Sequence, residues 1–210
     1  MISMNTILVV DDSRDVVDIF VKMLEKGGYG TFAAHGGEEC LEILKEVAPD
    51  LILLDIMMEP MDGWETLEKI KNNVATVPIP VLILTSKQLT PAEMEKYGDD
   101  IEDYVLKPVT DFEMYTAIEH VFHRRQTIRS EVDRAMKRGV DSGVVNEYAL
   151  LLRSVDINKQ FLNIFETRYN LNNSNIHSSD NICQALKKLD ATIRVQKTRL
   201  QEIEGKIRIP

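Results

Sequence analysis

Chemically active side chains follow short apolar runs in the first half of this 210-residue chain. They are carboxylates, a hydroxyl and an amine: Asp11, Asp12, Asp55, Thr85 and Lys107. A single acid after a strand is most often a helix cap. Three acids close behind apolar runs, together with a Lys-Pro pair, exceed what capping needs and indicate a functional site.

The charges of these groups predict phosphoryl chemistry with a divalent cation. Clustered carboxylates repel one another unless a cation binds, and their hard oxygen atoms suit Mg²⁺, which keeps several waters. One carboxylate can act as the nucleophile towards a phosphoryl group and form an aspartyl-phosphate. The metal and an amine then neutralise the charge of the transferring group, and a hydroxyl can hydrogen-bond it.

The elements that must position these side chains are short strands buried on both faces. The runs of Val, Ile and Leu are continuous rather than alternating, which is typical of a parallel sheet. The expected strands are 7–10, 31–34, 51–54, 81–84 and 103–106. Apolar residues at helical spacing lie between them, at 16–24, 38–47, 64–71 and 91–97. Strand alternating with helix predicts an α/β, doubly wound parallel sheet, whose ligands gather at the carboxyl ends of the strands.

The composition excludes several classes of protein. Apolar residues make up 44% and charged residues 28%, as in globular domains and unlike disordered chains. No apolar run is long enough for a transmembrane helix, and the N-terminus lacks the basic segment of a secretory signal. Two cysteines, Cys40 and Cys183, are too few for a disulfide framework or a zinc knuckle. The expected location is the cytoplasm, without a membrane partner.

Charge divides the chain into two parts. Residues 1–108 contain 9 Lys and Arg against 21 Asp and Glu, a balance of −12. Residues 109–210 contain 16 against 13, a balance of +3. A shift of this size indicates two units with a boundary shortly after Pro108.

Five motifs carry a resemblance to a known family. They are ILVVDDS at 7–13, DLILLDIMM at 50–58, MDGWE at 61–65, LILTSK at 82–87 and DYVLKPV at 103–109. With these motifs, residues 5–122 resemble the receiver domain of two-component response regulators and are similar to the chemotaxis receiver protein. The stretch DIMMEPMDGWETL also has a faint resemblance to methanogenic archaeal receivers.

The resemblance implies a fold and a set of residue roles. The fold is flavodoxin-like, with five parallel strands in the order 2-1-3-4-5. Asp55 is implied as the phosphoacceptor and Lys107 as the phosphate-binding amine, followed by a cis peptide bond to Pro108. Thr85 and Tyr104 are implied as the switch pair that responds to phosphate. The implied Mg²⁺ ligands are Asp12, Asp55, the backbone carbonyl of Met57 and, through a water, Asp11.

The resemblance also implies a partner and a limit on the chemistry. A receiver takes its phosphoryl group from a sensor histidine kinase, so the chain is expected to signal rather than to act as an enzyme beyond self-phosphorylation and self-dephosphorylation. The sequence departs from the family at Glu59, where proline is usual, and at Asp100-Ile101, where small residues are usual. Met57 and Lys87, which flank the route of the attacking water in the family, do not readily orient a water.

Long heptad patterns fill the rest of the chain. We predict a receiver domain at 1–122 and a helical module at 123–210, with a last receiver helix that continues to about 138 and helices at about 144–170 and 180–206. The middle seam consists of Val144, Tyr148, Leu151, Val155, Leu162, Phe165 and Tyr169. Arg125, Asn158 and Gln196 are polar residues within the seams, and Asn170–Ser179 is turn-forming. The seams fit a closed three-helix monomer and an intertwined homodimer equally.

Two hypotheses remain for the output of the chain. The first is a phospho-dependent switch whose helical module dimerises or binds a partner protein. The alternative is a transcription regulator whose helical tail binds nucleic acid. Basic residues between Arg124 and Arg138 favour the alternative, but Glu131 and Asp133 interrupt them and the second half has a balance of only +3. A kinase-like phosphoacceptor helix is not indicated, because neither His120 nor His123 is followed by an acidic residue.

Overall fold

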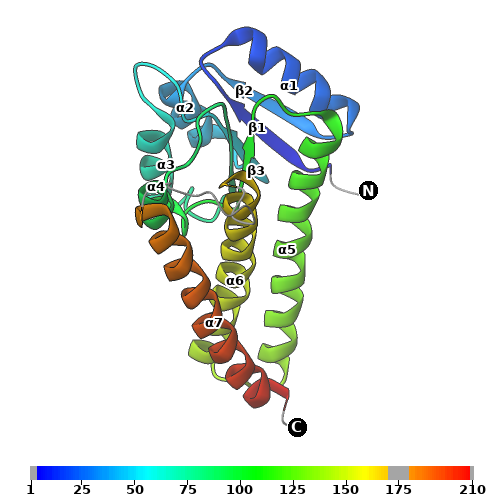
Figure 1. Ribbon diagram of the computed structural model, residues 1–210. Helices are drawn as coiled ribbons and strands as arrows, with labels where there is room; N and C mark the ends of the chain where they lie inside the picture. The colour runs from blue at the N-terminus through cyan, green and yellow to red at the C-terminus, as the bar shows by residue number, and fades with distance from the viewer. Residues whose placement is uncertain (1–3, 170–179, 209–210) are drawn as a thin grey trace. The chain divides into compact units, whose positions relative to one another are not determined.

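The computed structural model describes residues 4–169 and 180–208 (Figure 1). Its strands form one five-stranded sheet: β1 (Thr6–Val10), β2 (Gly30–Ala34), β3 (Leu51–Leu54), β4 (Val81–Thr85) and β5 (Asp103–Leu106). All neighbouring strands are parallel, in the order β2-β1-β3-β4-β5. The predicted α/β, doubly wound sheet is therefore confirmed, with its strand order.

Helices connect the strands and make up the C-terminal half of the described residues. They are α1 (Arg14–Lys26), α2 (Gly37–Glu46), α3 (Gly63–Lys71), α4 (Pro91–Tyr97), α5 (Asp111–Lys137), α6 (Ser142–Tyr169) and α7 (Asp180–Arg208). The chain divides into two compact units, the first ending at Val121 and the second starting at Phe122. α5 runs through this boundary as one helix. The predicted all-helical C-terminal region is confirmed, and the turn expected at Asn170–Ser179 lies outside the described residues.

Burial of the central strands explains why the continuous apolar runs form a sheet. Every residue of β3 and β4 is buried, whereas four of the five residues of the edge strand β2 are half-exposed. Each fully buried Val, Leu or Ile side chain stabilises the fold by roughly 1.5–3 kcal/mol relative to exposure. α1 and α5 lie side by side, because the Tyr115 hydroxyl donates to the Met23 carbonyl at 2.6 Å and Lys26 pairs with Asp111 at 3.0 Å.

The register of the sheet brings the carboxyl ends of four strands together. Val10 is opposite Leu54, Leu54 is opposite Ile83, and Thr85 is opposite Leu106. The residues that end or directly follow these strands therefore reach the same edge: Asp11, Asp55, Thr85 and Lys107. The sequence places chemically active side chains at this edge because parallel strands end together.

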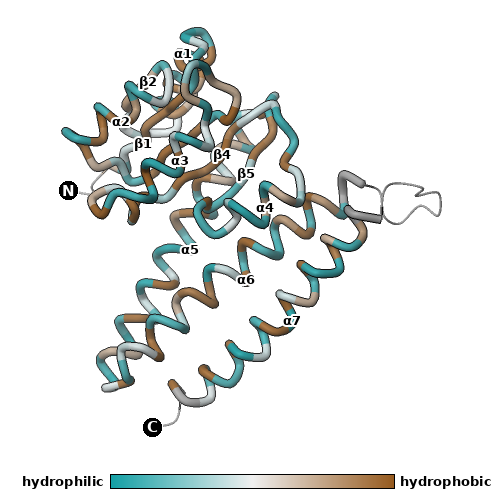
Figure 2. Tube along the Cα trace, turned by 90° about the vertical axis from the view of Figure 1, so that its left-hand side faces the viewer, coloured by the Kyte–Doolittle hydropathy of each residue, from teal (hydrophilic) through white to brown (hydrophobic). Residues whose placement is uncertain are grey.

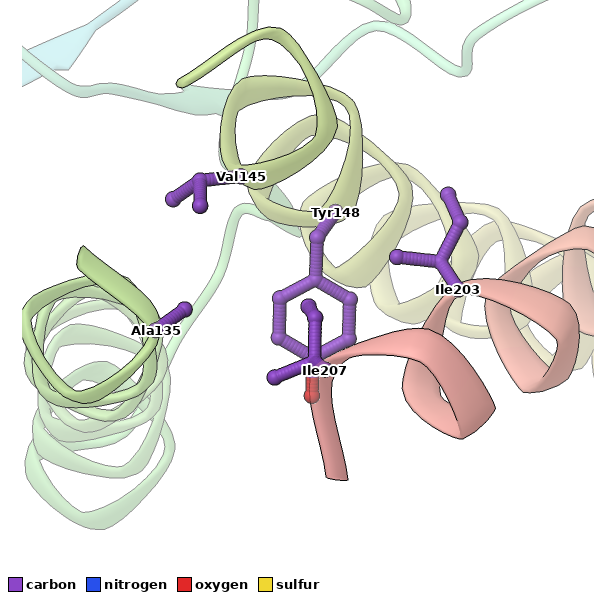
Figure 3. Close-up of a cluster of buried hydrophobic side chains, with 5 residues drawn as sticks. All are labelled: Ala135, Val145, Tyr148, Ile203 and Ile207. Carbon is purple, nitrogen blue, oxygen red and sulfur yellow. The ribbon is translucent and has the colours of Figure 1, made fainter. Parts of the chain in front are cut away.

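The helical unit has an apolar core of its own. Buried side chains from α5, α6 and α7 gather in Figure 3: Ala135, Val145, Tyr148, Ile203 and Ile207. Half-buried apolar residues surround them: Val132, Val140, Val144, Leu151, Leu152 and Leu200. Apolar and polar segments alternate along these helices in Figure 2, as expected for helices with one buried stripe. Three helices of one chain thus share a single core.

Two details of the predicted seams are wrong. Val145, Ile157 and Phe161 are buried although the predicted seam omitted them, because α6 packs against both α5 and α7 and needs a wider apolar face than one heptad seam. On α5, Arg125 is exposed and Arg124 is buried instead. The Nη1 atom of Arg124 lies 2.8 Å from a carboxylate oxygen of Asp156 on α6.

The polar residues of the two remaining seams pair with each other across α6 and α7. The Asn158 amide donates to the side-chain oxygen of Gln196 at 3.1 Å, and the Gln196 amide donates to the Ser154 hydroxyl at 2.7 Å. Nearby, the Arg199 guanidinium donates to both carboxylate oxygens of Glu147 at 2.7 and 2.9 Å. These hydrogen bonds satisfy polar side chains that lose contact with water when the helices pack.

The cysteines and the helix composition add two facts. Both cysteines are free thiols, and burial raises the pKa of Cys40 to about 12, which keeps this thiol protonated and unreactive. Among the helices of the described residues, none combines the length and the apolar character needed to cross a membrane.

The shared core predicts a large cost for truncating Tyr148. We expect Tyr148→Ala to lower the free energy of unfolding of the helical unit by about 3 kcal/mol, because it removes a buried aromatic ring from the centre of the core. Leu150→Ala is the matched control, since Leu150 is 66% exposed two residues along the same helix and should change the value by less than about 0.5 kcal/mol. Urea denaturation followed by far-UV circular dichroism measures both. Equal losses in the two variants would contradict this core.

Candidate functional site

Three predicted site residues meet in one buried ion cluster at the carboxyl edge of the sheet. The Lys107 ammonium contacts a carboxylate oxygen of Asp55 at 2.7 Å and also a carboxylate oxygen of Asp11. The exposed fractions of the three side chains are 14% for Lys107, 9% for Asp55 and 5% for Asp11. The ring of Phe20 on α1 lies 5.9 Å from the ammonium and shields one side of it. One cation is thus shared by two buried carboxylates.

The surroundings move the pKa values of these carboxylates in opposite directions. Burial raises the pKa of Asp11, and the neighbouring charge of Asp55 adds to this. Burial also opposes ionisation of Asp55, but hydrogen bonds from Lys107, Thr85 and the backbone N–H of Met57 outweigh it and lower the pKa of Asp55. Asp55 is therefore held as a carboxylate, which is the form a nucleophile requires.

Thr85 and Tyr104, the predicted switch pair, are both buried and both bound to the chain around Lys87. The Thr85 hydroxyl hydrogen-bonds Asp55 and accepts from the backbone N–H of Lys87 at 3.2 Å. The Tyr104 hydroxyl donates to the backbone carbonyl of Lys87 at 2.6 Å and accepts from the N–H of Leu89 at 3.3 Å. The backbone of one residue thus connects the hydroxyl beside the acceptor with the aromatic ring.

Asp12 lies at the exposed side of the site and binds a different group. Its carboxylate accepts from the backbone N–H of Glu59 at 3.2 Å, which ties the end of β1 to the loop after β3. The same loop contains Met57, whose side chain is 59% exposed and whose N–H donates to Asp55 at 3.0 Å. Peptide bonds preceding Pro60 and Pro108 are cis, the second as the resemblance implied.

The structure tests the predicted metal ligands by their chemistry and by their grouping. Carboxylates of two buried acids and one exposed acid, with backbone carbonyls of the loop at 55–59, are hard oxygen donors of the kind Mg²⁺ prefers. Within the residues that the structure describes, no three acidic, histidine or cysteine side chains are grouped closely enough to hold a metal ion. The donors thus fit Mg²⁺ in chemical kind, although the described side chains do not by themselves form a metal site.

Gly63 is a positioning residue. It lies within the motif MDGWE at 61–65, but no role was predicted for it from the sequence. It is the first residue of α3, and its N–H donates to the Ile56 carbonyl at 2.9 Å. A Cβ atom at this position would overlap the backbone carbonyl oxygen of Asp55 and the Cα atom of Ile56. The helix can approach the acceptor loop this closely only because glycine has no side chain.

A second group of residues beside the site was missed by the sequence reasoning. Lys87 pairs with Glu93 on α4 at 2.6 Å, and the indole N–H of Trp64 donates to the same carboxylate oxygen at 3.0 Å. The Trp64 ring stacks on Tyr97, with centroids 4.2 Å apart. The spacing of Thr90 and Glu93, which form a capping box, was the one signal that could have placed Glu93 at the start of a helix.

Comparisons with known proteins give named relatives for the first unit. The chain is 41% identical over 109 residues to a probable cyclic di-GMP phosphodiesterase of Vibrio cholerae, which covers 52% of this chain and 24% of that protein. It is 34% identical over 124 residues to the transcriptional regulatory protein CpxR of Escherichia coli, covering 58% of this chain and 50% of that one. The chain thus spans half or less of these two curated relatives.

A solved structure covers the same region. The N-terminal domain of a response regulator receiver protein from Methanoculleus marisnigri is 65% identical, covers 57% of this chain and 97% of its own, and has a TM-score of 0.49.

Two family models divide the chain between them. The model described as Metanogen output domain 2 matches residues 124–210. The model described as response regulator receiver domain matches residues 7–119, which is more than half of the chain and includes each of the predicted site residues. The resemblance inferred from the motifs is confirmed, and the chain belongs to the response regulator receiver family.

Proposed function

We propose that this receiver accepts a phosphoryl group on Asp55 from a sensor histidine kinase and that the helical unit transmits the phosphorylated state. The observation that carries the proposal is the ionised, buried Asp55, with the Lys107 ammonium at 2.7 Å and the Thr85 hydroxyl bound to it. A nucleophile, a cation and a hydrogen-bond donor at one point are what phosphoryl transfer requires. Self-phosphorylation and self-dephosphorylation are the only chemistry we assign to the chain.

Each side chain has a role in the transfer. A carboxylate oxygen of Asp55 attacks phosphorus, the bond from phosphorus to the kinase histidine breaks, and the histidine nitrogen keeps the electron pair and takes a proton. The Lys107 ammonium lies beside the oxygens that gain negative charge, and the Thr85 hydroxyl is free to turn from Asp55 to a phosphoryl oxygen. Asp11 holds the ammonium in place from its other side.

We assign Asp12, Asp55 and the backbone carbonyl of Met57 as the direct Mg²⁺ ligands, with Asp11 acting through a water. A bound Mg²⁺ would supply neutralisation of the charge on the transferring group. The support is electrostatic: two buried acids share one ammonium, and the pKa of Asp11 is raised by burial and by Asp55. The exposed carboxylate of Asp12 leaves one side of the site open to a hydrated ion.

The acceptor is tested by removing its nucleophilic oxygen. Asp55→Asn should reduce labelling by a radioactive small phosphodonor to background, because the amide cannot form the acyl phosphate. Asp50→Asn is a matched control that alters an acid on the opposite, N-terminal side of β3 and should keep full labelling. Far-UV circular dichroism checks that both variants fold. Stoichiometric labelling of Asp55→Asn would assign the phosphoryl group to another residue.

The metal is tested by chelation. Excess EDTA should reduce labelling of Asp55 at least tenfold, and added Mg²⁺ should restore it, because the transferring group then loses a divalent charge at the site. Ca²⁺ is a useful comparison, since it takes more ligands at longer distances than Mg²⁺ does. Undiminished labelling in EDTA would remove Mg²⁺ from the proposal.

We infer that the helical unit forms a homodimer or binds a partner protein. The support is continuity: α5 is one uninterrupted helix that starts in the first unit and ends in the second. The backbone of Lys87 joins Thr85 to Tyr104, so a movement of Thr85 towards phosphate reaches the buried ring directly. A signal of this kind needs two states that the phosphate biases through different contacts.

The nucleic-acid alternative gains no support from the basic residues of α5 and of the turn that follows it. Arg134 pairs with Glu131 at 2.7 Å, Arg124 is buried against Asp156, and Arg138 donates to the backbone carbonyl of Ile207 at 3.4 Å. Several of the cations that a phosphate backbone would need are thus engaged within the chain. The activities in the names of the Vibrio cholerae and Escherichia coli relatives are those of longer proteins.

The output proposal predicts a change of assembly on activation. Beryllium fluoride with Mg²⁺ should shift the sedimentation profile of the parent chain away from that of the 24.0 kDa unactivated protein at equal concentration. Thr85→Ala should reduce the shift, because it removes the hydroxyl that links the acceptor to Tyr104. Analytical ultracentrifugation measures both. Identical profiles with and without beryllium fluoride, at demonstrated full occupancy, would contradict a phospho-dependent assembly.

A further inference from the structure

Lys87 and Glu93 form a charged pair beside the acceptor that the proposed function does not use. The Lys87 ammonium lies 2.6 Å from a carboxylate oxygen of Glu93, and the two side chains are 39% and 16% exposed. The backbone of Lys87 is fixed next to the site, because its N–H donates to the Thr85 hydroxyl, which in turn binds Asp55. The backbone of Lys87 thus lies beside the acceptor, whereas its ammonium pairs with Glu93.

Glu93 is an immobile anion. One of its oxygens accepts from the backbone N–H and the hydroxyl of Thr90 at 2.9 and 2.8 Å, and the other accepts from the indole N–H of Trp64 at 3.0 Å. Burial opposes its ionisation, but the hydrogen bonds from Lys87, Thr90 and Trp64 lower its pKa to about 2. Thr90 and Trp64 therefore hold the Glu93 carboxylate in place independently of its contact with Lys87.

Lys87 is the movable member of the pair. Its side chain is a flexible four-carbon stem, and pairs of this exposure are weak because water screens them. Phosphorylation would add a strongly anionic group with several acceptor oxygens to Asp55. The Thr85 hydroxyl, which hydrogen-bonds Asp55, also accepts from the backbone N–H of Lys87. The Glu93 carboxylate and the phosphoryl group, which has the greater negative charge, would then compete for the Lys87 ammonium.

We propose that Glu93 is a positioning residue of the phosphoryl site and acts through Lys87. In the unphosphorylated chain Glu93 holds the Lys87 ammonium away from Asp55, and Lys87 leaves Glu93 for the phosphoryl oxygens once Asp55 is phosphorylated. This inference rests on the proposed role of Asp55. Trp64 keeps its bond to the carboxylate oxygen that Lys87 releases, so α3 senses the exchange through its indole ring.

A double-mutant cycle on the full chain tests the exchange, with beryllium fluoride and Mg²⁺ as the probe. Glu93→Gln should bind beryllium fluoride about threefold more tightly, because Lys87 no longer has to leave an anion. Glutamine is chosen because it still completes the capping box with Thr90. Lys87→Met should bind more weakly than the parent, and adding Glu93→Gln to it should change nothing further.

Trp64 gives a spectroscopic signature, since it is the single tryptophan of the chain and stacks on Tyr97. Its fluorescence should change on binding of beryllium fluoride to the parent, and the change should be lost in Lys87→Met. Glu95→Gln, which removes an equal charge from the exposed side of α4, should keep the parent's affinity and its fluorescence change. Circular dichroism checks that every variant folds.

The outcomes separate this inference from the proposed function. If the parent neither labels on Asp55 nor binds beryllium fluoride, the proposed function fails and the role of Glu93 fails with it. If the parent does both, unchanged or weaker binding in Glu93→Gln overturns the role of Glu93 alone. Equal tightening by Glu93→Gln in the Lys87→Met background also overturns it, because the effect would then pass through the start of α4 and not through Lys87.

Discussion

The shared ammonium of Lys107 is the interaction on which the site depends. Two carboxylates at the ends of adjacent strands, both nearly excluded from water, would repel each other strongly without it. Removing one partner from a buried ion pair typically costs about 3–5 kcal/mol, because the other charge stays buried and uncompensated. The positions of Asp11, Asp55 and Lys107 are therefore not independent, and the loops after β1, β3 and β5 must close on one another for the site to exist.

The two carboxylates of this cluster contribute to stability with opposite pH dependence. The pKa of Asp55 is lower in the folded chain than in the unfolded chain. Asp55 therefore stabilises the fold at pH values above its unfolded-state pKa, and this contribution is lost as the pH falls through its folded-state pKa. The raised pKa of Asp11 has the opposite sign: its contribution is present at low pH and is lost as the pH rises through the folded value. Ionisation of Asp11 therefore costs the fold free energy, and a cation that binds at this edge would reduce that cost.

The sequence was sufficient for the sheet and for the residues at its carboxyl edge, because strand type and strand end are local patterns. Contacts between elements were not predictable in this way. Glu93 contacts Lys87 and Trp64 only after α3 and α4 pack. Glycine is needed at position 63 because α3 lies against the backbone of Asp55 and Ile56, and the spacing of residues in the sequence does not show this contact. The error at Arg125 is confined to one position: the predicted seam residues Val121 and Ala135 are buried on either side of it, and the charge of Arg124 pairs with Asp156 on α6, a contact that the repeat does not record.

The hydrogen bonds that join α6 to α7 do not depend on which copy of the chain supplies each helix. Asn158, Ser154 and Gln196 would make the same bonds if α7 came from a second molecule. Helix exchange is therefore close to neutral in contact energy, and the effective concentration of the tethered α7 decides the balance. For a helix tethered by a short flexible linker this concentration is on the order of millimolar. At lower protein concentrations a chain pairs its own helices, and an exchanged dimer needs a further contact elsewhere to persist.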